Sequence, residues 1–468
     1  MGGVTNAVLE FSKRVSFREL PAEVIHQGKR CLQDGIGVIL AGSTEECSAI
    51  LRRQLVGYGG GAEAAVFGCE ALRAPTSLAA RANATAGHAM DFDDTQLSSS
   101  PDRIFGLLTH PTMAPLAAAL AVGERLAVSG AKFLEAFLVG FEVECKIAEA
   151  IHPAHYQKGF HSSGTVGTFG AAVAAARLMD LDRSQLEMAI GIATSLTSGI
   201  RISFGTMAKP LQLGRAAENG VVAAELAANG FTGGKQALDG PWGFFSVFGG
   251  GVDTDRIVGA LGNPYSVVEP GVSVKPYPCG SLAHPSMDAM LKLMLEYDVK
   301  AGEIEAIVLR AGSNILDPLR YAFPENALEA KFSLPFVLSS MALCRKAGIA
   351  EFTDAFVCSE PVRGMMRKVK VMRDPDIEAQ GFEKMRSVVG VHLQDGRRLE
   401  RSAEKYRGGP DRPLTQDELR QKFNDCAGLA LAEKRVATAI EQIESIDLLG
   451  SIVELTETLT DSREATSP

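Results

Sequence analysis

Three carboxylates and a hydroxyl lie close together in the segment from Gly87 to Pro115. Asp91, Asp93 and Asp94 fall within four residues and precede Thr95. Carboxylates this close together repel one another unless each has a binding partner or a functional role. The DxDxT spacing fits a phosphatase with an aspartate nucleophile, and the acidic run is similar to a DDxxD magnesium site. Yet the preceding ANATAGHAM is a poor buried strand and no second acidic cluster follows, so both readings are secondary to a capping or loop cluster.

Histidines gather in a second segment, HPAHYQKGFHSSG. His152, His155 and His161 lie within ten residues, but the HExxH glutamate is missing and Pro153 breaks the helix that would hold two metal ligands. His161 stands directly before the helix-capping run at 162–164. Because a helix N-terminus attracts carboxylates, a catalytic His161 is one hypothesis and a hydrogen-bonded structural histidine is the other.

Two lysines stand next to prolines in apolar surroundings. Lys209 lies in TMAKPLQLG, and Lys275 lies in VKPYPCGSLAH together with Tyr277 and His284. Such lysines could clamp a substrate anion, although a solvated surface position is the commoner fate of a lysine.

These residues must be positioned by two kinds of element. Up to residue 268 the pattern is helical: Phe133, Phe137 and Phe141 share one helix face, and residues 165–179 and 215–228 are Ala-rich helix candidates. Strand-like segments follow at 304–310, 369–372 and 388–401, the last with a hairpin signal at Asp395–Gly396. Helices are expected again at 416–429 and 433–448.

The chain therefore predicts a mainly α protein with a smaller α+β lid domain. We expect a helical domain built from residues 1–268 and 406–468, and a lid formed by residues 269–405. The ends of the chain would then fold together around the first domain.

The composition of the chain argues against several classes of function. The net charge of −9 argues against nucleic acid as a partner, because binding phosphates requires clustered Lys and Arg. The eight cysteines are scattered without a CxxC pair, which indicates reduced thiols and a cytoplasmic location. No apolar run is long enough for a membrane span.

Taken in order along the chain, these segments resemble the MmgE/PrpD family, which contains 2-methylcitrate dehydratase, cis-aconitate decarboxylase and iminodisuccinate epimerase. The similarity rests on HAMDFDDT at 88–95, which has the HxxDFDDT pattern, on the HP pair at His110 and on FHSSGTVGTFG at 160–170. It also rests on AKP at 208–210, KPYPC at 275–279 and AKFSLPF at 330–336. It covers nearly the whole chain.

The resemblance implies a homodimer that needs no metal and no cofactor, and a lyase, either a hydro-lyase or a decarboxylase, acting on a small di- or tricarboxylate such as 2-methylcitrate or cis-aconitate. An epimerase or isomerase of a dicarboxylate is the alternative within the family, and a magnesium-dependent phosphatase is the alternative outside it. The resemblance assigns Asp91, Thr95, His110, His161 and Lys209 to the pocket, and Tyr277, Cys279 and His284 to the lid side.

The corresponding mechanism is proton transfer at a carbon next to a carboxylate. We expect His110 and His161 to form the acid–base pair, with Asp91 orienting one imidazole. Lys209, with Arg103 or Lys275, would clamp the carboxylates.

Thr95 would hydrogen-bond one substrate carboxylate, and Tyr277 and His284 would contact the substrate from the lid.

Two departures from the family pattern stand out. The segment 96–108 is long and carries Asp102 and Arg103, which could reach the pocket, and Phe336 replaces a frequent tyrosine.

Overall fold

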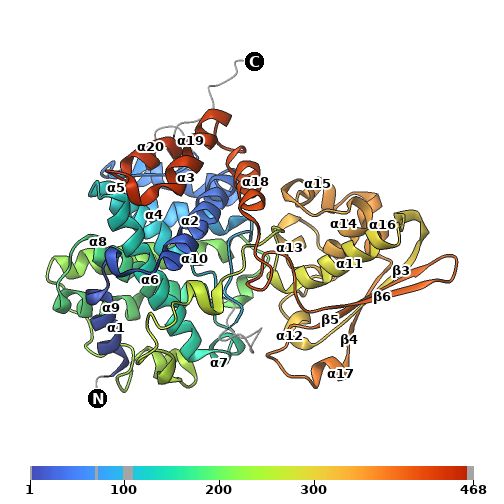
Figure 1. Cartoon of the computed structure of the whole chain (residues 1–468), viewed down its shortest axis with the longest axis horizontal. Helices are drawn as coiled ribbons and strands as arrows, with labels where there is room; N and C mark the ends of the chain where they lie inside the picture. Colours follow the sequence, from blue (N-terminus) through green and yellow to red (C-terminus); the bar gives the residue numbers. More distant parts are fainter. Residues whose placement is uncertain (1–2, 69–71, 99–108, 461–468) are drawn as a thin grey trace.

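The computed structural model describes residues 3–68, 72–98 and 109–460. They form a large helical body and a smaller lid that projects from one side of it (Figure 1). The first and the last described helices, Val4–Arg14 and Val453–Thr460, both lie in the body (Figure 1). The mainly α class with an α+β lid is thus confirmed.

The body consists of helices that pack in several layers. Those that shape it are α1 (Val4–Arg14), α2 (Ala22–Gly42), α3 (Glu46–Tyr58), α4 (Thr76–Ala89), α5 (Met113–Arg125), α6 (Gly130–Ile151), α8 (Ser162–Leu178), α9 (Arg183–Leu196), α10 (Ala208–Ala228), α18 (Gln416–Ala427), α19 (Glu433–Glu444) and α20 (Val453–Thr460). The short helix α7 (Ala154–Gln157) and the strand pair β1 (Ala64–Ala65) and β2 (Arg73–Ala74) complete it.

The expected helices of the body are present. The three aligned phenylalanines lie on α6 and are buried. The two Ala-rich segments form α8 and α10, whose small residues allow close packing. A Cβ on Gly214 of α10 would lie 2.7 Å from the carbonyl oxygen of Arg81 in α4. This close approach matters because α10 carries Lys209 and α4 carries His88.

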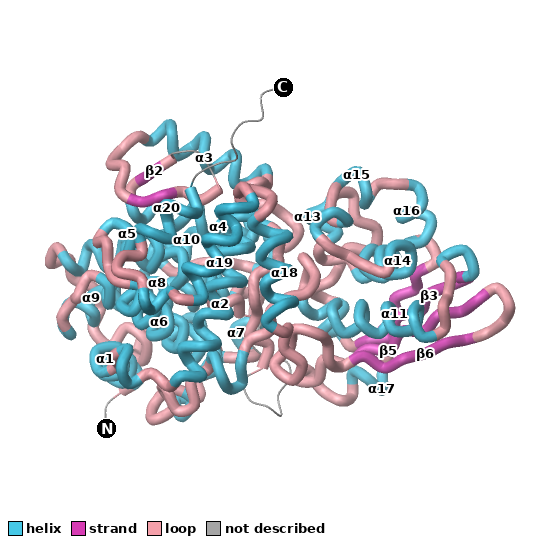
Figure 2. The backbone as a smooth tube through the Cα atoms, turned by 45° about the horizontal axis from the view of Figure 1, so that its top comes forward, coloured by secondary structure: helices cyan, strands magenta, loops and turns pink. Residues whose placement is uncertain are grey.

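The lid is a four-stranded sheet covered on one face by helices (Figures 1 and 2). The strand order is β4-β3-β5-β6, with β3 (Ile304–Ala311) parallel to β4 (Val369–Arg373) and antiparallel to β5 (Ser387–Leu393), which pairs with β6 (Arg398–Ala403). The hairpin expected at Asp395–Gly396 joins β5 and β6. The helices of the lid are α11 (His284–Glu296), α12 (Ser313–Leu316), α13 (Ala327–Ala330), α14 (Leu334–Cys344), α15 (Asp354–Val357), α16 (Glu360–Met366) and α17 (Pro375–Glu378).

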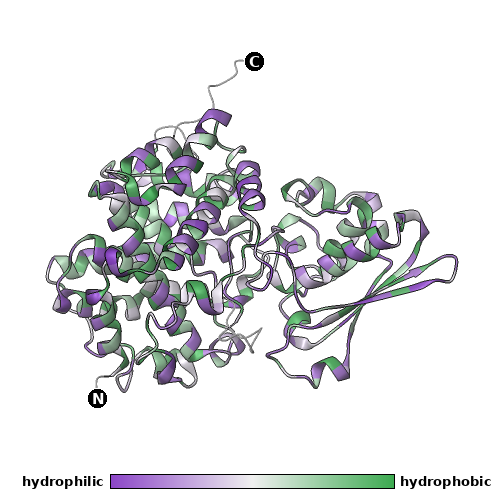
Figure 3. Cartoon of the chain, in the orientation of Figure 1, coloured by the Kyte–Doolittle hydropathy of each residue, from purple (hydrophilic) through white to green (hydrophobic). Residues whose placement is uncertain are grey.

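Body and lid have separate hydrophobic cores. The core of the body joins residues from Val4 to Val267 with residues from Phe423 to Leu459, so the end of the chain packs against its beginning. The lid core runs from Tyr277 to Tyr406 and also takes up Leu97 and Phe204 from the body segments. Hydrophobic residues gather in the inner helices of both parts (Figure 3). Within the described ranges, no helix combines the length and apolar character required to span a bilayer.

Candidate active site

A small cavity lies between body and lid. Its volume is about 40 Å³. The lining comes from both parts: Asp91, Thr95, His110, Tyr156, His161, Phe204 and Lys209 from the body segments, and Lys275, Gly280, Ser281, Leu282, Pro318, Leu319 and Phe332 from the lid side. Residues far apart in sequence therefore meet at one place.

The turn that follows α4 is the centre of this site. Asp91 has φ of +52°, a left-handed conformation that Asp tolerates better than most residues. Buried lysines bind the carbonyl oxygens of the turn: Lys331 that of Ala89 at 2.9 Å, Lys275 that of Asp91 at 2.8 Å and Lys422 that of Phe92 at 2.8 Å. Two of these lysines belong to the lid side and one to α18, so the turn is fixed by three separate parts of the chain.

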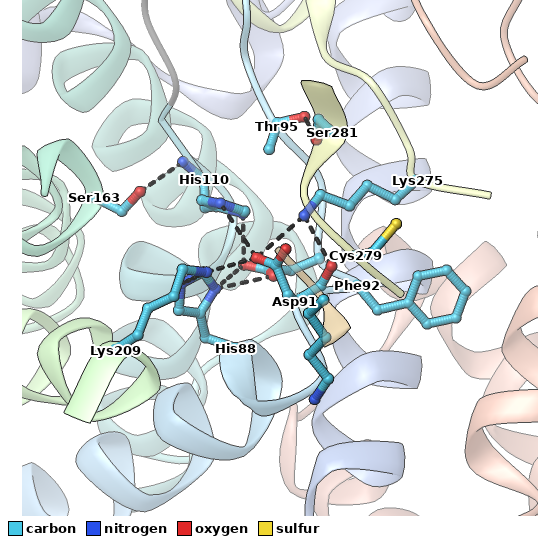
Figure 4. A network of polar contacts seen from close by, with 12 residues as sticks. His88, Asp91, Phe92, Thr95, His110, Ser163, Lys209, Lys275, Cys279 and Ser281 are labelled. Atoms are coloured by element: carbon cyan, nitrogen blue, oxygen red, sulfur yellow. Dashed lines mark hydrogen bonds and ion pairs between the residues drawn. The ribbon is translucent and has the colours of Figure 1, made fainter. Parts of the chain in front are cut away.

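The carboxylate of Asp91 binds two ammonium groups. Its Oδ1 lies 2.5 Å from Nζ of Lys209 and 3.3 Å from Nζ of Lys275 (Figure 4). Burial raises the pKa of Asp91, but the two ammoniums outweigh burial and hold this pKa well below its usual value. Burial lowers the pKa of Lys209, and Asp91 opposes that shift.

His88 connects Lys209 to a second carboxylate. Its Nδ1 lies 2.9 Å from Oδ2 of Asp93, and its Nε2 lies 2.8 Å from Nζ of Lys209. Because an ammonium can only donate, Nε2 accepts and Nδ1–H donates to Asp93. Burial lowers the pKa of His88 to about 3, so this imidazole is neutral.

His110 shares the carboxylate of Asp93 with His88. The Nδ1 of His110 lies 3.1 Å from Oδ2 of Asp93, whereas its Nε2 lies 3.9 Å from Oδ1 of Asp91. The backbone N–H of His110 donates to Oγ of Ser163 at the start of α8. Of the two carboxylates, Asp93 is thus the nearer to the His110 ring, although Asp91 was the one expected to orient an imidazole.

His161 occupies the N-cap position of α8. Its Nδ1 lies 2.7 Å from Oε1 of Gln212, whose amide nitrogen donates to the carbonyl of Ile200. Nδ1 therefore carries the proton, and Nε2 keeps its lone pair. The ring centroids of His88 and His161 are 5.6 Å apart, and those of His88 and His110 are 4.4 Å apart. The two imidazoles expected to act together are therefore both neighbours of His88.

Thr95 connects the site to the lid. It pairs with Ser273 through two backbone hydrogen bonds, and its Oγ1 lies 3.0 Å from Oγ of Ser281. Thr95 and Ser281 both line the cavity, so two adjacent hydroxyls, one from the body and one from the lid side, are available to a substrate.

Other residues expected to bind substrate lie elsewhere. Tyr277 donates its hydroxyl to Asp288 at 2.7 Å, and His284 is buried between the rings of Tyr277 and Tyr406. Among the described residues, neither Tyr277 nor His284 belongs to the lining of the cavity. Arg103 lies outside the described residues.

The substitution of Phe336 for tyrosine has no contact with this cavity. Phe336 is fully buried in the lid core, against Phe352 and Phe356. This departure from the family pattern therefore lies away from the cavity lining.

Four of these side chains could offer ligands to a metal ion. His88, Asp91, Asp93 and His110 each place one donor atom within 4.8 Å of the others. However, the ammonium of Lys209 already contacts two of the four residues, at 2.5 and 2.8 Å. A divalent cation at the same place would be repelled by this ammonium, so the donor set fits a lysine better than a metal.

Sequence reasoning did not select His88, Asp93 or Ser281 as site residues. The signal for His88 and Asp93 was present, since both belong to the HAMDFDDT element. What was missing was the distance from His88 to Lys209, which is 121 positions away along the chain.

The fold and the site together define a mainly helical, two-domain protein with imidazoles, carboxylates and ammoniums buried between body and lid. Comparison with known families gives the same architecture: the MmgE/PrpD N-terminal domain matches residues 7–257 and the MmgE/PrpD C-terminal domain matches residues 277–448. The chain belongs to the MmgE/PrpD family.

Its curated relatives are similar over nearly their full length. Cis-aconitate decarboxylase of Homo sapiens is 29% identical over 451 residues, covering 94% of this chain and 91% of the relative. The enzyme of the same name from Mus musculus is 28% identical over 447 residues, covering 93% and 89%. That from Aspergillus terreus (strain NIH 2624 / FGSC A1156) is 25% identical over 482 residues, covering 98% and 96%.

Proposed function

We propose that this protein is a cofactor-independent lyase that decarboxylates cis-aconitate or a closely related di- or tricarboxylate. One observation carries the proposal: His110, His161, Lys209 and Lys275 line one buried cavity between body and lid. The activity for which its relatives are named supplies the substrate class.

The ammonium groups would bind and polarise the substrate. Lys209 and Lys275 enter from opposite sides, α10 and the lid segment, and both lie at the Asp91 carboxylate. A substrate carboxylate placed in the cavity would meet these ammoniums and the hydroxyls of Thr95 and Ser281. Fixed cations in a site that excludes water stabilise charge that develops in the transition state.

The imidazoles would then transfer the proton. When the C–C bond to one carboxylate breaks, carbon dioxide leaves and the electron pair spreads over the neighbouring double bond and carboxylate. An imidazolium delivers a proton to carbon, and the imidazole regains one before the next turnover. Dehydration uses the same groups in another order, with one imidazole taking a proton from carbon and an acid protonating the departing hydroxyl.

The direct test is an NMR assay with the purified protein and cis-aconitate, 2-methylcitrate and citrate, without added metal. Release of carbon dioxide from cis-aconitate, with the matching decarboxylated product, supports the proposal. Loss of water from 2-methylcitrate, with cis-aconitate left intact, would show that the activity is dehydration and not decarboxylation. No reaction with any of the three would refute a lyase of this substrate class.

Epimerisation of a dicarboxylate is the second candidate. The observation that favours it is that two imidazoles, those of His110 and His161, line the same cavity, since two separate bases can remove a proton from one face and return it to the other. Deuterium incorporation from D₂O without loss of water or carbon dioxide would identify this activity. A phosphatase, by contrast, would lose its activity with EDTA and would hydrolyse a phosphate ester.

We also propose that the chain forms a homodimer in the cytoplasm. The seven described cysteines are all free, which suits a reducing compartment. Sedimentation at micromolar concentration should give twice the mass of 49.6 kDa, and a monomer would contradict the dimer. Cell fractionation tests the compartment.

A further inference from the structure

We propose that binding of a polycarboxylate is coupled to the uptake of a proton by His110, so that the substrate itself creates the acid that the reaction requires. This inference rests on the proposed function and adds to it a chemical state of the enzyme. It follows from the balance of charges in the cavity.

The cations at the cavity are already compensated. Lys209 and Lys275 both contact the same oxygen of Asp91, at 2.5 and 3.3 Å. Lys275 is only 1% exposed and Lys209 is 4% exposed, so solvent does not screen either of them. Asp93 adds a second carboxylate, in contact with His88 and His110. Asp93 does not itself line the cavity; together with Asp91 it gives two carboxylates to match the two ammoniums of the described site.

The imidazoles do not add positive charge. Burial lowers the pKa of His88, of His110 and of His161 below the usual value, and the neighbouring ammoniums act in the same direction. At neutral pH the free site therefore holds three neutral imidazoles. A neutral imidazole can serve as a base, but it cannot serve as the acid that protonates carbon.

A bound substrate changes this balance. A di- or tricarboxylate brings two or three negative charges among buried side chains, and a buried charge without compensation is costly. Uptake of a proton from solvent compensates one of these charges without moving the protein. Negative charge nearby favours the protonated form of a histidine.

His110 is the imidazole placed to take that proton. Asp93 lies 3.1 Å from its Nδ1, and Asp91 lies 3.9 Å from its Nε2. Lys209 on α10 and Lys275 on the lid side oppose protonation, His88 on α4 is neutral, and Ser163 on α8 accepts from the backbone. His161 has Gln212 as its partner, and the charged group that acts on it most strongly is the ammonium of Lys209. The two carboxylates therefore favour His110 over His161.

Calorimetry with a non-reacting ligand tests the proposal. Tricarballylate, a saturated tricarboxylate, is titrated into the whole protein at pH 7.5 in PIPES and in Tris, whose ionisation enthalpies differ. We expect a buffer-dependent heat corresponding to about one proton taken up per site, and a Kd that rises about tenfold per pH unit. Binding with the same heat in both buffers and a Kd that does not change with pH would overturn the proposal but leave the proposed function standing.

Variants locate the proton. His110→Gln should lose the buffer-dependent heat, whereas His161→Gln, the matched control in the same cavity, should keep it. Should His110→Gln fail to fold, ¹⁵N spectra of the wild-type histidine rings give the same answer, since one ring must change from neutral to protonated when tricarballylate binds. No change in any ring, or a heat that is lost only in His161→Gln, contradicts the assignment to His110. Absence of all tricarboxylate binding would refute both this inference and the proposed function.

Discussion

At the scale of single residues, the site is defined by which carboxylate faces which cation. The three acidic residues of HAMDFDDT look equivalent in the sequence, but each has a different partner. Asp91 contacts two ammoniums, Asp93 contacts two imidazoles, and Asp94 accepts a hydrogen bond from Thr112. Their chemistry therefore differs as much as their surroundings do.

The first prediction concerns His161. Its Nε2 keeps a lone pair at the cavity because Nδ1 is committed to Gln212. His161→Ala should lower kcat on the substrate identified by the NMR screen by about 10²–10⁴, the usual contribution of a general acid or base. Steady-state kinetics and a melting curve measure this. Unchanged kcat would remove His161 from the mechanism.

The second prediction concerns Asp94 and pH. Burial raises the pKa of Asp94 to about 8 in the folded protein, whereas an unfolded aspartate titrates near 4. The folded state therefore keeps a proton that the unfolded state loses. Stability from this group is present at low pH and is lost as the pH rises from about 4 to about 8.

Asp94→Asn cannot titrate, and its amide oxygen can still accept from Thr112. Relative to the wild type, the free energy of unfolding of the variant should increase by up to about 1.4 kcal/mol for each pH unit between about pH 4 and about pH 8. Above this range the difference should stay constant. Urea unfolding between pH 5 and pH 9 checks the trend. Asp417→Asn, at an exposed position, is the control and should show no such pH trend. A difference in unfolding free energy between variant and wild type that decreases as the pH rises would contradict this prediction.

At the scale of elements, the contacts of the site depend on how closely the helices approach. His88 sits on the last turn of α4, and Lys209 sits on the first turn of α10. These helices must pass near each other for the 2.8 Å contact between the two side chains. Small residues at the crossing provide this approach.

The third prediction tests the crossing. Gly214→Ala places a methyl group 2.7 Å from the carbonyl of Arg81 and against Thr85. Overpacking of this kind costs about 1–3 kcal/mol, and moving α10 away from α4 should also lower kcat. Gly57→Ala in α3 is the matched control, because nothing lies within 4 Å of its new methyl group; it should leave kcat unchanged. Equal behaviour of the two variants in melting and kinetics would contradict this account.

At the scale of the whole molecule, the site exists only when lid and body are together. Lys275, Lys331 and Thr95 all make contacts across this boundary. A cavity of about 40 Å³ holds a few water molecules, whereas pockets for small molecules usually measure about 300–1,000 Å³. We therefore expect the lid to move when a tricarboxylate enters.

The fourth prediction tests that movement. The hydroxyl of Thr95, from the body, and that of Ser281, from the lid side, lie 3.0 Å apart. In the double variant Thr95→Cys with Ser281→Cys, a disulfide should form and hold the lid closed. Activity should then be lost on oxidation and recovered with dithiothreitol, while each single variant should be indifferent to both. Equal activity of the oxidised and reduced forms would show that the lid need not open.

The sequence by itself determined the elements and the list of candidates. Periodicity predicted α8, α10 and the β5–β6 hairpin, and family motifs selected Asp91, Thr95, His110, His161, Lys209 and Lys275, all of which line the cavity. Local patterns are sufficient for this because helix and hairpin formation depends mainly on neighbouring residues.

Only the tertiary structure decided which of these groups are partners. The contact of His88 with Lys209 joins residues that are 121 positions apart in the chain. The pairing of Asp93 with two imidazoles and the placement of Tyr277 and His284 away from the cavity lining likewise depend on the folded arrangement. The reason is physical. A pKa and a hydrogen bond depend on distance and burial in space, and neither quantity is encoded in the spacing of residues along the chain.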